Sequence, residues 1–140
     1  MKAKTLKSNA LAKKSRAQAA TIKKVINLEK LVWKVAQERN ANAFQELVPA
    51  DAIMIFQSGI MRQADYVKTM KKRTISHYEF GPIRGFMPTG STVILFYQAV
   101  RLGHERSRRF PQGTVVESTT WVKRKGRWVA VLNQETPISE

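Results

Sequence analysis

The sequence contains no cysteine, and it lacks several other features that would indicate a particular class of protein. Without cysteine there is no disulfide, no catalytic thiol and no thiolate metal site. The chain has no apolar run of about 18 residues, so we expect no membrane span. The charged N-terminus lacks the apolar segment of a secretory signal peptide. These absences predict a cytoplasmic protein.

Histidine is scarce as well, with only two residues, His77 and His104. No carboxylate lies at metal-ligand spacing from either of them, so we expect no metal site. The sequence has no glycine-rich loop of the kind that binds phosphate, and its spacing suggests no Ser–His–acid set. We therefore expect no cofactor.

Acidic residues are few and unevenly placed. Ten Asp and Glu residues stand against 25 Lys and Arg, which gives a net charge of +15. Residues 1–28 contain eight of the basic residues and no acid. Such a bias favours an acidic partner, such as nucleic acid, anionic lipid or an acidic protein, although a solubilising tail has the same composition.

The length of 140 residues corresponds to one domain. We divide the chain into a basic arm at residues 1–20 and a folded domain at residues 21–140. The arm is rich in Ala and Lys, which are good helix formers, so it either extends the following helix or acts as an import segment. Thr21–Asn40 is the clearest helix, and its apolar face carries Glu29 between Ile26 and Trp33.

The remaining elements are predicted to be short helices followed by strands. Asn42 and Gln45 form a capping-box pattern at the start of a short helix that Pro49 ends. A buried strand and a third helix follow, and Gly126 supplies the positive φ of a hairpin turn between the last two strands. Helices followed by an antiparallel meander predict an α+β fold with a strongly curved sheet. The predicted elements after the short helix are 52–57, 64–72, 76–81, 83–87, 92–102, 114–123 and 127–134.

Several of these segments resemble the nuclear transport factor 2-like superfamily. The resemblance rests on the spacing from Glu29 to Ala36, the Asp51–Gly59 strand and turn, the stretch from Ser118 to Trp128, and Gln134-x-Thr136-Pro137. It is closest to the SnoaL-like, uncharacterised-domain branch, which shares its fold with ketosteroid isomerase. It implies a cone-shaped, cystatin-like roll, in which a curved antiparallel sheet packs on N-terminal helices around a pocket, and a homodimer.

The chain departs from ketosteroid isomerase at the positions that carry its chemistry. The resemblance places Phe56 where that enzyme has its general-base aspartate, and Val32 or Trp33 where it has its oxyanion-hole tyrosine. These side chains cannot accept or donate the required proton in the same way. Asn133 stands where the family often has a histidine. Isomerase chemistry of that kind is therefore not expected.

Glu29 is the candidate catalytic residue. A carboxyl among apolar side chains is desolvated, which raises its pKa toward a useful range for acid–base chemistry. In the alternative interpretation, Glu29 accepts hydrogen bonds from a tryptophan indole or an arginine and only fixes the helix. Four aromatic residues either line a pocket or form plain core, and one of two adjacent amides faces inward. These pocket candidates are Trp33, Phe56, Tyr97, Trp121, Asn133 and Gln134.

Two hypotheses for function follow. In the first, a SnoaL-like domain binds a hydrophobic small molecule in an apolar pocket, with or without proton transfer on a hydrophobic carbonyl compound. In the second, the chain is a non-enzymatic adaptor whose basic arm docks to nucleic acid or another acidic partner. The sequence leaves open whether the chain is an enzyme. The candidate anion-contacting residues are Lys13, Lys14, Arg16, Arg106, Arg108 and Arg109.

Overall fold

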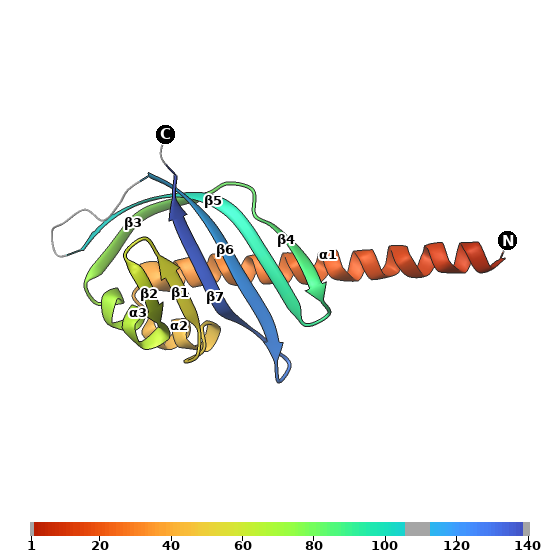
Figure 1. Cartoon of the computed structure of the whole chain (residues 1–140), viewed down its shortest axis with the longest axis horizontal. Coiled ribbons are helices and arrows are strands. Elements are labelled where there is room, and N and C mark those ends of the chain that lie inside the picture. Colours follow the sequence, from red (N-terminus) through yellow and green to blue (C-terminus); the bar gives the residue numbers. More distant parts are fainter. Residues whose placement is uncertain (1, 106–112, 139–140) are drawn as a thin grey trace.

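The computed structural model describes residues 2–105 and 113–138. Within them, three helices pack against one face of a curved sheet of seven strands (Figure 1). The predicted α+β architecture is thereby confirmed. The sheet bends over the second half of α1, and the first half of that helix projects beyond the sheet.

Helix α1 (Lys2–Gln37) includes both the basic arm and the helix expected from Thr21. From Thr21 onward, one face enters the core, because Val25, Glu29 and Trp33 recur at helical spacing and are all buried. Arg39, with φ 56°, reverses the chain after the helix. Helix α1 lies close to the sheet at Gly85 on β4. A Cβ at this glycine would lie 3.3 Å from Ile22 of α1 and 2.6 Å from Leu95.

Short elements connect α1 to the sheet. Helix α2 (Ala41–Leu47) is followed by β1 (Ile53–Phe56), β2 (Gly59–Arg62) and α3 (Gln63–Met70). The cap of α2 was predicted at Asn42, but Asn40 caps it, since its side chain accepts a hydrogen bond from the Ala43 amide at 3.1 Å. The predicted turn at Ser58–Gly59 opens β2, which the sequence did not indicate.

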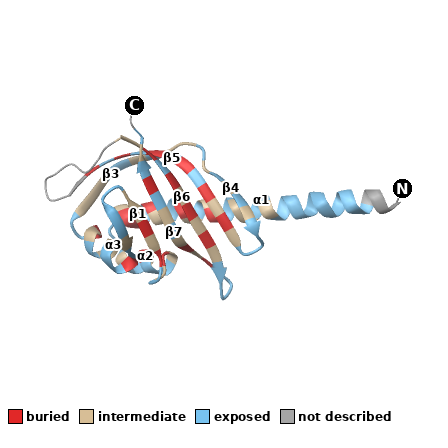
Figure 2. Cartoon of the chain, in the orientation of Figure 1, coloured by how far each residue is buried: buried red, intermediate tan, exposed pale blue. Residues whose placement is uncertain are grey.

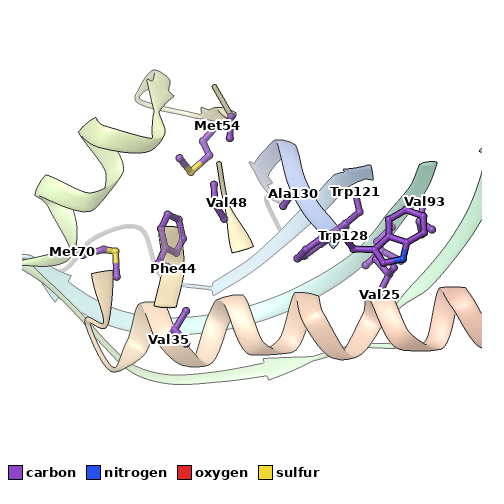
Figure 3. Packing of buried hydrophobic residues seen from close by; sticks show 12 residues of the cluster. Val25, Val35, Phe44, Val48, Met54, Met70, Val93, Trp121, Trp128 and Ala130 are labelled. Atoms are coloured by element: carbon purple, nitrogen blue, oxygen red, sulfur yellow. The ribbon is translucent and has the colours of Figure 1, made fainter. Parts of the chain in front are cut away.

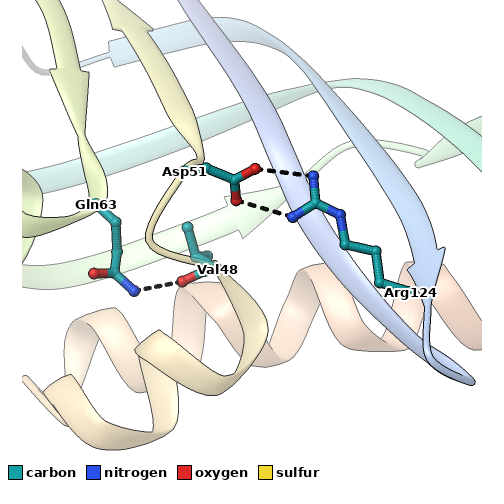
Figure 4. A network of polar contacts seen from close by, with 4 residues as sticks. All are labelled: Val48, Asp51, Gln63 and Arg124. Atoms are coloured by element: carbon teal, nitrogen blue, oxygen red, sulfur yellow. Dashed lines mark hydrogen bonds and ion pairs between the residues drawn. The ribbon is translucent and has the colours of Figure 1, made fainter.

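Two polar contacts hold these short elements in place (Figure 4). The Gln63 side chain donates to the carbonyl of Val48 at 2.8 Å and ties α3 to the end of α2. Arg124 makes two hydrogen bonds to Asp51, at 2.9 and 3.0 Å, and links the β6–β7 hairpin to the segment before β1. The Arg124 guanidinium lowers the pKa of Asp51. Because the pair is exposed, it positions the hairpin with little effect on stability.

The later strands form most of the sheet. They are β3 (Arg73–Phe80), β4 (Arg84–Thr89), β5 (Thr92–Glu105), β6 (Gly113–Arg124) and β7 (Arg127–Pro137). The order is β2-β1-β7-β6-β5-β3, and β4 pairs with the other half of β5. The predicted antiparallel arrangement needs one correction, because β1 and β7 are parallel. A parallel pair requires a long crossover, and here all the elements from β2 to β6 lie between the two strands.

The β6–β7 hairpin has the expected tight turn, with Lys125 and Gly126 both at positive φ. Its register shifts by one residue, because Trp121 pairs with Ala130 but Thr120 pairs with Leu132. Such a bulge moves the following residues of β7 to the opposite faces of the sheet.

The apolar core lies between α1 and the concave face of the sheet. At one end, Val25, Val93, Trp121 and Trp128 pack together, while Phe44, Val48, Met54 and Met70 pack at the other (Figure 3). Figure 2 shows that burial alternates along β5, β6 and β7, as expected for a sheet with one covered face.

Candidate functional site

A cavity of about 70 Å³ lies at the end of the core that contains Phe44, Val48 and Met54. One part of its wall is apolar and aromatic, and the other part carries acidic and amide side chains from α1 and the strands. Its walls come from the three helices and from β1, β3, β5, β6 and β7. The polar and aromatic side chains that line the cavity are Glu29, Trp33, Phe44, Phe56, Tyr66, Arg101, Glu117, Thr119, Asn133 and Glu135.

The side chain of Glu29 is 2% exposed and accepts three hydrogen bonds. Tyr97 donates from its hydroxyl at 2.7 Å, Thr119 from its hydroxyl at 2.9 Å, and Trp121 from its indole N–H at 2.8 Å. We call these four residues the Glu29 cluster. Both carboxylate oxygens are occupied, since Trp121 bonds Oε1 and the two hydroxyls bond Oε2.

Two N–H groups fix the direction of the hydroxyls in the Glu29 cluster. The indole N–H of Trp33 donates to the hydroxyl oxygen of Tyr97 at 2.8 Å, and the amide of Asn133 donates to that of Thr119 at 2.8 Å. Because an N–H can only donate, each hydroxyl accepts from it and points its own hydrogen at Glu29. This arrangement suits an ionised carboxylate.

Burial and hydrogen bonding act in opposite directions on Glu29. Burial raises the pKa of Glu29, and the bonds from Tyr97, Trp121 and Thr119 lower it in part. Burial and the charge of Glu29 also raise the pKa of Tyr97 well above its ordinary value, so the tyrosine keeps its proton. The geometry therefore favours Glu29 as a fixed anchor between α1 and the sheet, with little capacity left to take a further proton.

Glu117 is a second buried acid, and it differs from Glu29 in its partners. Its side chain is 3% exposed, and its Oε1 accepts a hydrogen bond from the Asn133 amide at 3.2 Å. Its Oε2 is buried and has no hydrogen-bond partner among the residues that the structure describes. Burial, and then the charges of Glu135 and Glu29, raise the pKa of Glu117 well above its ordinary value.

Glu135 faces Glu117 directly across the β6–β7 ladder. It forms a buried ion pair with Arg101, with 2.5 Å between Oε1 and the guanidinium nitrogen. Burial raises the pKa of Glu135, and the charges of Arg101 and Arg73 counter part of that shift. We call Glu117, Glu135 and Arg101 the Glu117 cluster. The two clusters share Asn133, whose amide donates to both Thr119 and Glu117.

The apolar part of the cavity is formed by three stacked rings. Tyr66 lies between Phe44 and Phe56, with ring centroids 4.9 and 6.0 Å apart and interplanar angles of 22° and 18°. Aromatic rings in this arrangement give a flat, rigid wall. A ligand that contacts the rings and the Glu117 cluster together would need an apolar body and one polar group.

Three of the six pocket residues predicted from the sequence line the cavity, and the other three do not. Trp33, Phe56 and Asn133 line the cavity, while Tyr97 and Trp121 lie behind it and bind Glu29. Gln134 is exposed and lines no part of this cavity. Lys13, Lys14 and Arg16 are exposed on the projecting half of α1, whereas Arg106, Arg108 and Arg109 lie outside the described residues.

Sequence reasoning missed Glu117, Glu135 and Arg101. A signal existed for two of them, since Glu117 has the same strand parity as Trp121, and Arg101 the same parity as Tyr97. For Glu135 no such signal was available, because the bulge between β6 and β7 decides which face it occupies. Among the residues that the structure describes, no three His, Cys, Asp or Glu side chains are placed to hold a metal ion.

No protein-family model matches this sequence, and no curated protein matches it either. Solved structures do match in fold. A nuclear transport factor 2-like protein from Cytophaga hutchinsonii is 15% identical, with a TM-score of 0.75 over 81% of this chain and 95% of that one. The association domain of a calmodulin-dependent kinase from Caenorhabditis elegans is 11% identical, with a TM-score of 0.71 over 86% and 98%.

A third similar structure, from Shewanella frigidimarina, is described provisionally as a ketosteroid isomerase. It is 15% identical, with a TM-score of 0.59 over 79% of this chain and 92% of that one. At such identities the likeness shows the fold alone, and the chain has the nuclear transport factor 2-like fold expected from the sequence. In the part of the chain that is described, no helix is long and apolar enough to cross a membrane.

Proposed function

We propose that the chain binds a small, mainly apolar carbonyl compound in the cavity, and that Glu117 donates a hydrogen bond to the carbonyl oxygen. The observation that carries this proposal is the buried Oε2 atom of Glu117, which has no hydrogen-bond partner within residues 2–105 and 113–138. A buried polar atom without a hydrogen bond costs about 1–3 kcal/mol, and a ligand that supplies the bond removes this cost.

The protonation state of Glu117 decides what it binds. Its raised pKa means that Glu117 keeps its proton at pH values where an exposed glutamate has lost it. Since Oε1 accepts a hydrogen bond from Asn133, the proton belongs on Oε2. A neutral carboxyl in this position is a hydrogen-bond donor that needs an acceptor, and a carbonyl oxygen meets that need.

The remaining walls set the size and polarity of the ligand. The stack of Phe44, Tyr66 and Phe56 favours a flat apolar body next to the carbonyl group. The cavity of about 70 Å³ is well below the range from about 300 Å³ upward that is usual for drug-sized ligands. Single-ring ketones and aldehydes therefore suit it better than a polycyclic compound.

Infrared spectroscopy of a bound ketone tests this proposal. Cyclohexanone and acetophenone, each labelled with ¹³C at the carbonyl, would show a lowered carbonyl stretching frequency when bound to the wild type. Glu117→Leu, which has no donor, should bind without the shift or not at all, and Glu117→Gln should keep part of it. Wild-type affinity should fall as pH rises through the pKa of Glu117. Failure of both ketones to bind, or an identical shift in Glu117→Leu, refutes the proposal.

Proton transfer on the bound compound is the more specific form of the same hypothesis. Glu117 would transfer its proton to the carbonyl oxygen while Glu135, opposite it on β7, removes a proton from the adjacent carbon, which gives the enol, a deprotonated Glu117 and a protonated Glu135. Exchange of that carbon's hydrogen with deuterium from heavy water, followed by NMR, measures this step. If the hydrogen exchanges no faster with the protein than in buffer alone, the domain binds the compound without turning it over.

We also propose that two copies of the chain associate through the convex face of the sheet. Phe86 and Phe96 are 49% and 43% exposed and in contact, with ring centroids 6.4 Å apart. Val100 and Val116 extend this apolar patch along β5 and β6. One of the similar structures is itself an association domain, which supports self-association. Exposed apolar side chains that gather on one face often mark an interface.

Sedimentation velocity tests the association. Phe96→Glu should convert a dimer into a monomer, because it places a charge at the centre of the apolar patch. Ile60→Glu is the matched control, since Ile60 is 73% exposed on β2, away from the patch, and its replacement should leave the dimer intact. A wild type that sediments as a monomer, or equal effects of both replacements, would disprove this interface.

A further inference from the structure

The first half of α1 makes little contact with the domain. Every residue from Leu6 to Ala17 is exposed, and the helix extends past the edge of the sheet beside β4 (Figures 1 and 2). At 1.5 Å per residue, residues 6–20 form a rod about 22 Å long. Packing on the domain therefore cannot explain why this half of α1 is present. Its amino-acid composition is the remaining guide to its role.

The four cations of this segment form two groups on the helix surface. At about 100° per residue, Lys7 and Lys14 lie about 20° apart. Arg16 is opposite Lys7, and Lys13 lies about 60° from Arg16. No acid occurs before Glu29. The exposed leucines, Leu6 and Leu11, are about 140° apart and form no apolar stripe.

The charges of this segment destabilise the helix in water. Lys13 and Arg16 are three residues apart, a spacing at which like charges repel, and no acidic residue lies in the first turn to balance the helix dipole. An external polyanion would remove this repulsion. The segment should therefore gain helix content when it binds one.

We propose that residues 6–20 bind duplex DNA by lying in the major groove and contacting phosphates on both sides. The groove is about 12 Å wide and admits an α-helix. Its two phosphate walls match the two groups of cations, Lys7 with Lys14 and Lys13 with Arg16, which lie on different sides of the rod. A membrane surface would require an apolar face, which the segment lacks. An acidic protein surface would contact one side only and leave the other cations unpaired. Contacts to phosphates alone carry no sequence preference.

Fluorescence anisotropy with a short duplex of mixed sequence tests this inference on the full-length protein. The test variant is Lys13→Gln/Lys14→Gln/Arg16→Gln. The control, Lys68→Gln/Lys71→Gln/Lys72→Gln, removes the same charge from exposed positions at the end of α3. Each phosphate contact contributes about −0.9 to the slope of log affinity against log salt, so the test variant should lose about 2.7 from the slope's magnitude. The control should retain the wild-type slope.

Circular dichroism supplies the second readout. Duplex DNA should increase the helix signal of the wild type and of the control variant, but leave that of the test variant unchanged. Equal losses of affinity in both variants would show an effect of net charge alone and overturn the inference. The same holds if phosphatidylserine vesicles or polyglutamate bind as tightly as DNA and raise the helix signal equally. None of these results bears on the cavity, whose ligand proposal is tested separately.

Discussion

The Glu29 cluster and the Glu117 cluster face the same cavity, and each contains an almost fully buried glutamate. Glu29 receives three hydrogen bonds, two of them from hydroxyls whose direction is fixed by Trp33 and Asn133. Glu117 receives one, from Asn133, and has an oxygen without a partner. Burial raises the pKa of both side chains. A raised pKa therefore does not distinguish a structural acid from a ligand-binding one, whereas the number of satisfied oxygen atoms does.

The comparison also separates two uses of a buried charge. In the Glu29 cluster, neutral donors from Tyr97, Thr119 and Trp121 hold a carboxylate and connect α1 to β5 and β6. Loss of the carboxylate would leave three donors without an acceptor. In the Glu117 cluster, the Arg101–Glu135 pair is complete, and Glu117 remains beside it as an extra acid. Removing Glu117 breaks the hydrogen bond from Asn133.

Replacement of Glu29 should give the largest effect and tests whether its role is structural. Glu29→Leu removes the acceptor for three buried donors, and each unsatisfied donor costs about 1–3 kcal/mol. We expect a loss of about 3–5 kcal/mol in the free energy of unfolding, measured by urea denaturation. Glu29→Gln, which keeps the volume and one acceptor oxygen, should lose less. A loss below about 1 kcal/mol in Glu29→Leu would contradict the anchoring role.

Replacement of Arg101 should have the next largest effect. Arg101→Met leaves Glu135 buried without its partner beside Glu117, and breaking a buried ion pair from one side costs about 3 kcal/mol or more. The double variant Arg101→Met/Glu135→Met removes both charges and should recover most of the loss in urea denaturation. If the double variant is as unstable as the single one, the ion pair is not what the arginine contributes.

The sequence predicted the fold and the Glu29 cluster better than the Glu117 cluster, for a physical reason. Helical spacing places Glu29 on the same face as Val25 and Trp33, and a local pattern suffices for that. The tryptophan indole expected to donate to Glu29 is that of Trp121, which lies 92 residues later in the sequence. The pairing of β1 with β7 joins distant parts of the chain, and no local pattern indicates its parallel direction.

The choice between Asn133 and Gln134 shows where sequence reasoning ends. Strand alternation indicates only that one of them faces inward. The bulge between Trp121 and Thr120 shifts β7 by one residue, so that Asn133 and Glu135 lie on the inner face while Gln134 is exposed. A single bulge thus brings the shared amide of both clusters and the partner of Arg101 to the cavity. Its position depends on how the hairpin packs, which the residue pattern does not specify.

Replacement of Glu117 should have the smallest effect on stability, and an effect that depends on pH. The folded state holds the proton of Glu117 more tightly than the unfolded state does, because its pKa is raised on folding. Between the ordinary and the raised pKa, the folded state binds more protons, so this residue lowers stability as pH increases. Glu117→Gln removes that dependence and retains a neutral, similarly shaped side chain.

We therefore expect the melting temperature of Glu117→Gln to match the wild type at acidic pH and to exceed it at alkaline pH, as measured by calorimetry across the pH range. The control is Glu46→Gln, which removes an exposed carboxylate on α2. If Glu117→Gln follows the wild type at every pH, then Glu117 titrates as an exposed residue does. The unpartnered oxygen would then be accessible to water, and the contrast between the two clusters would disappear together with the reason to expect a ligand at Glu117.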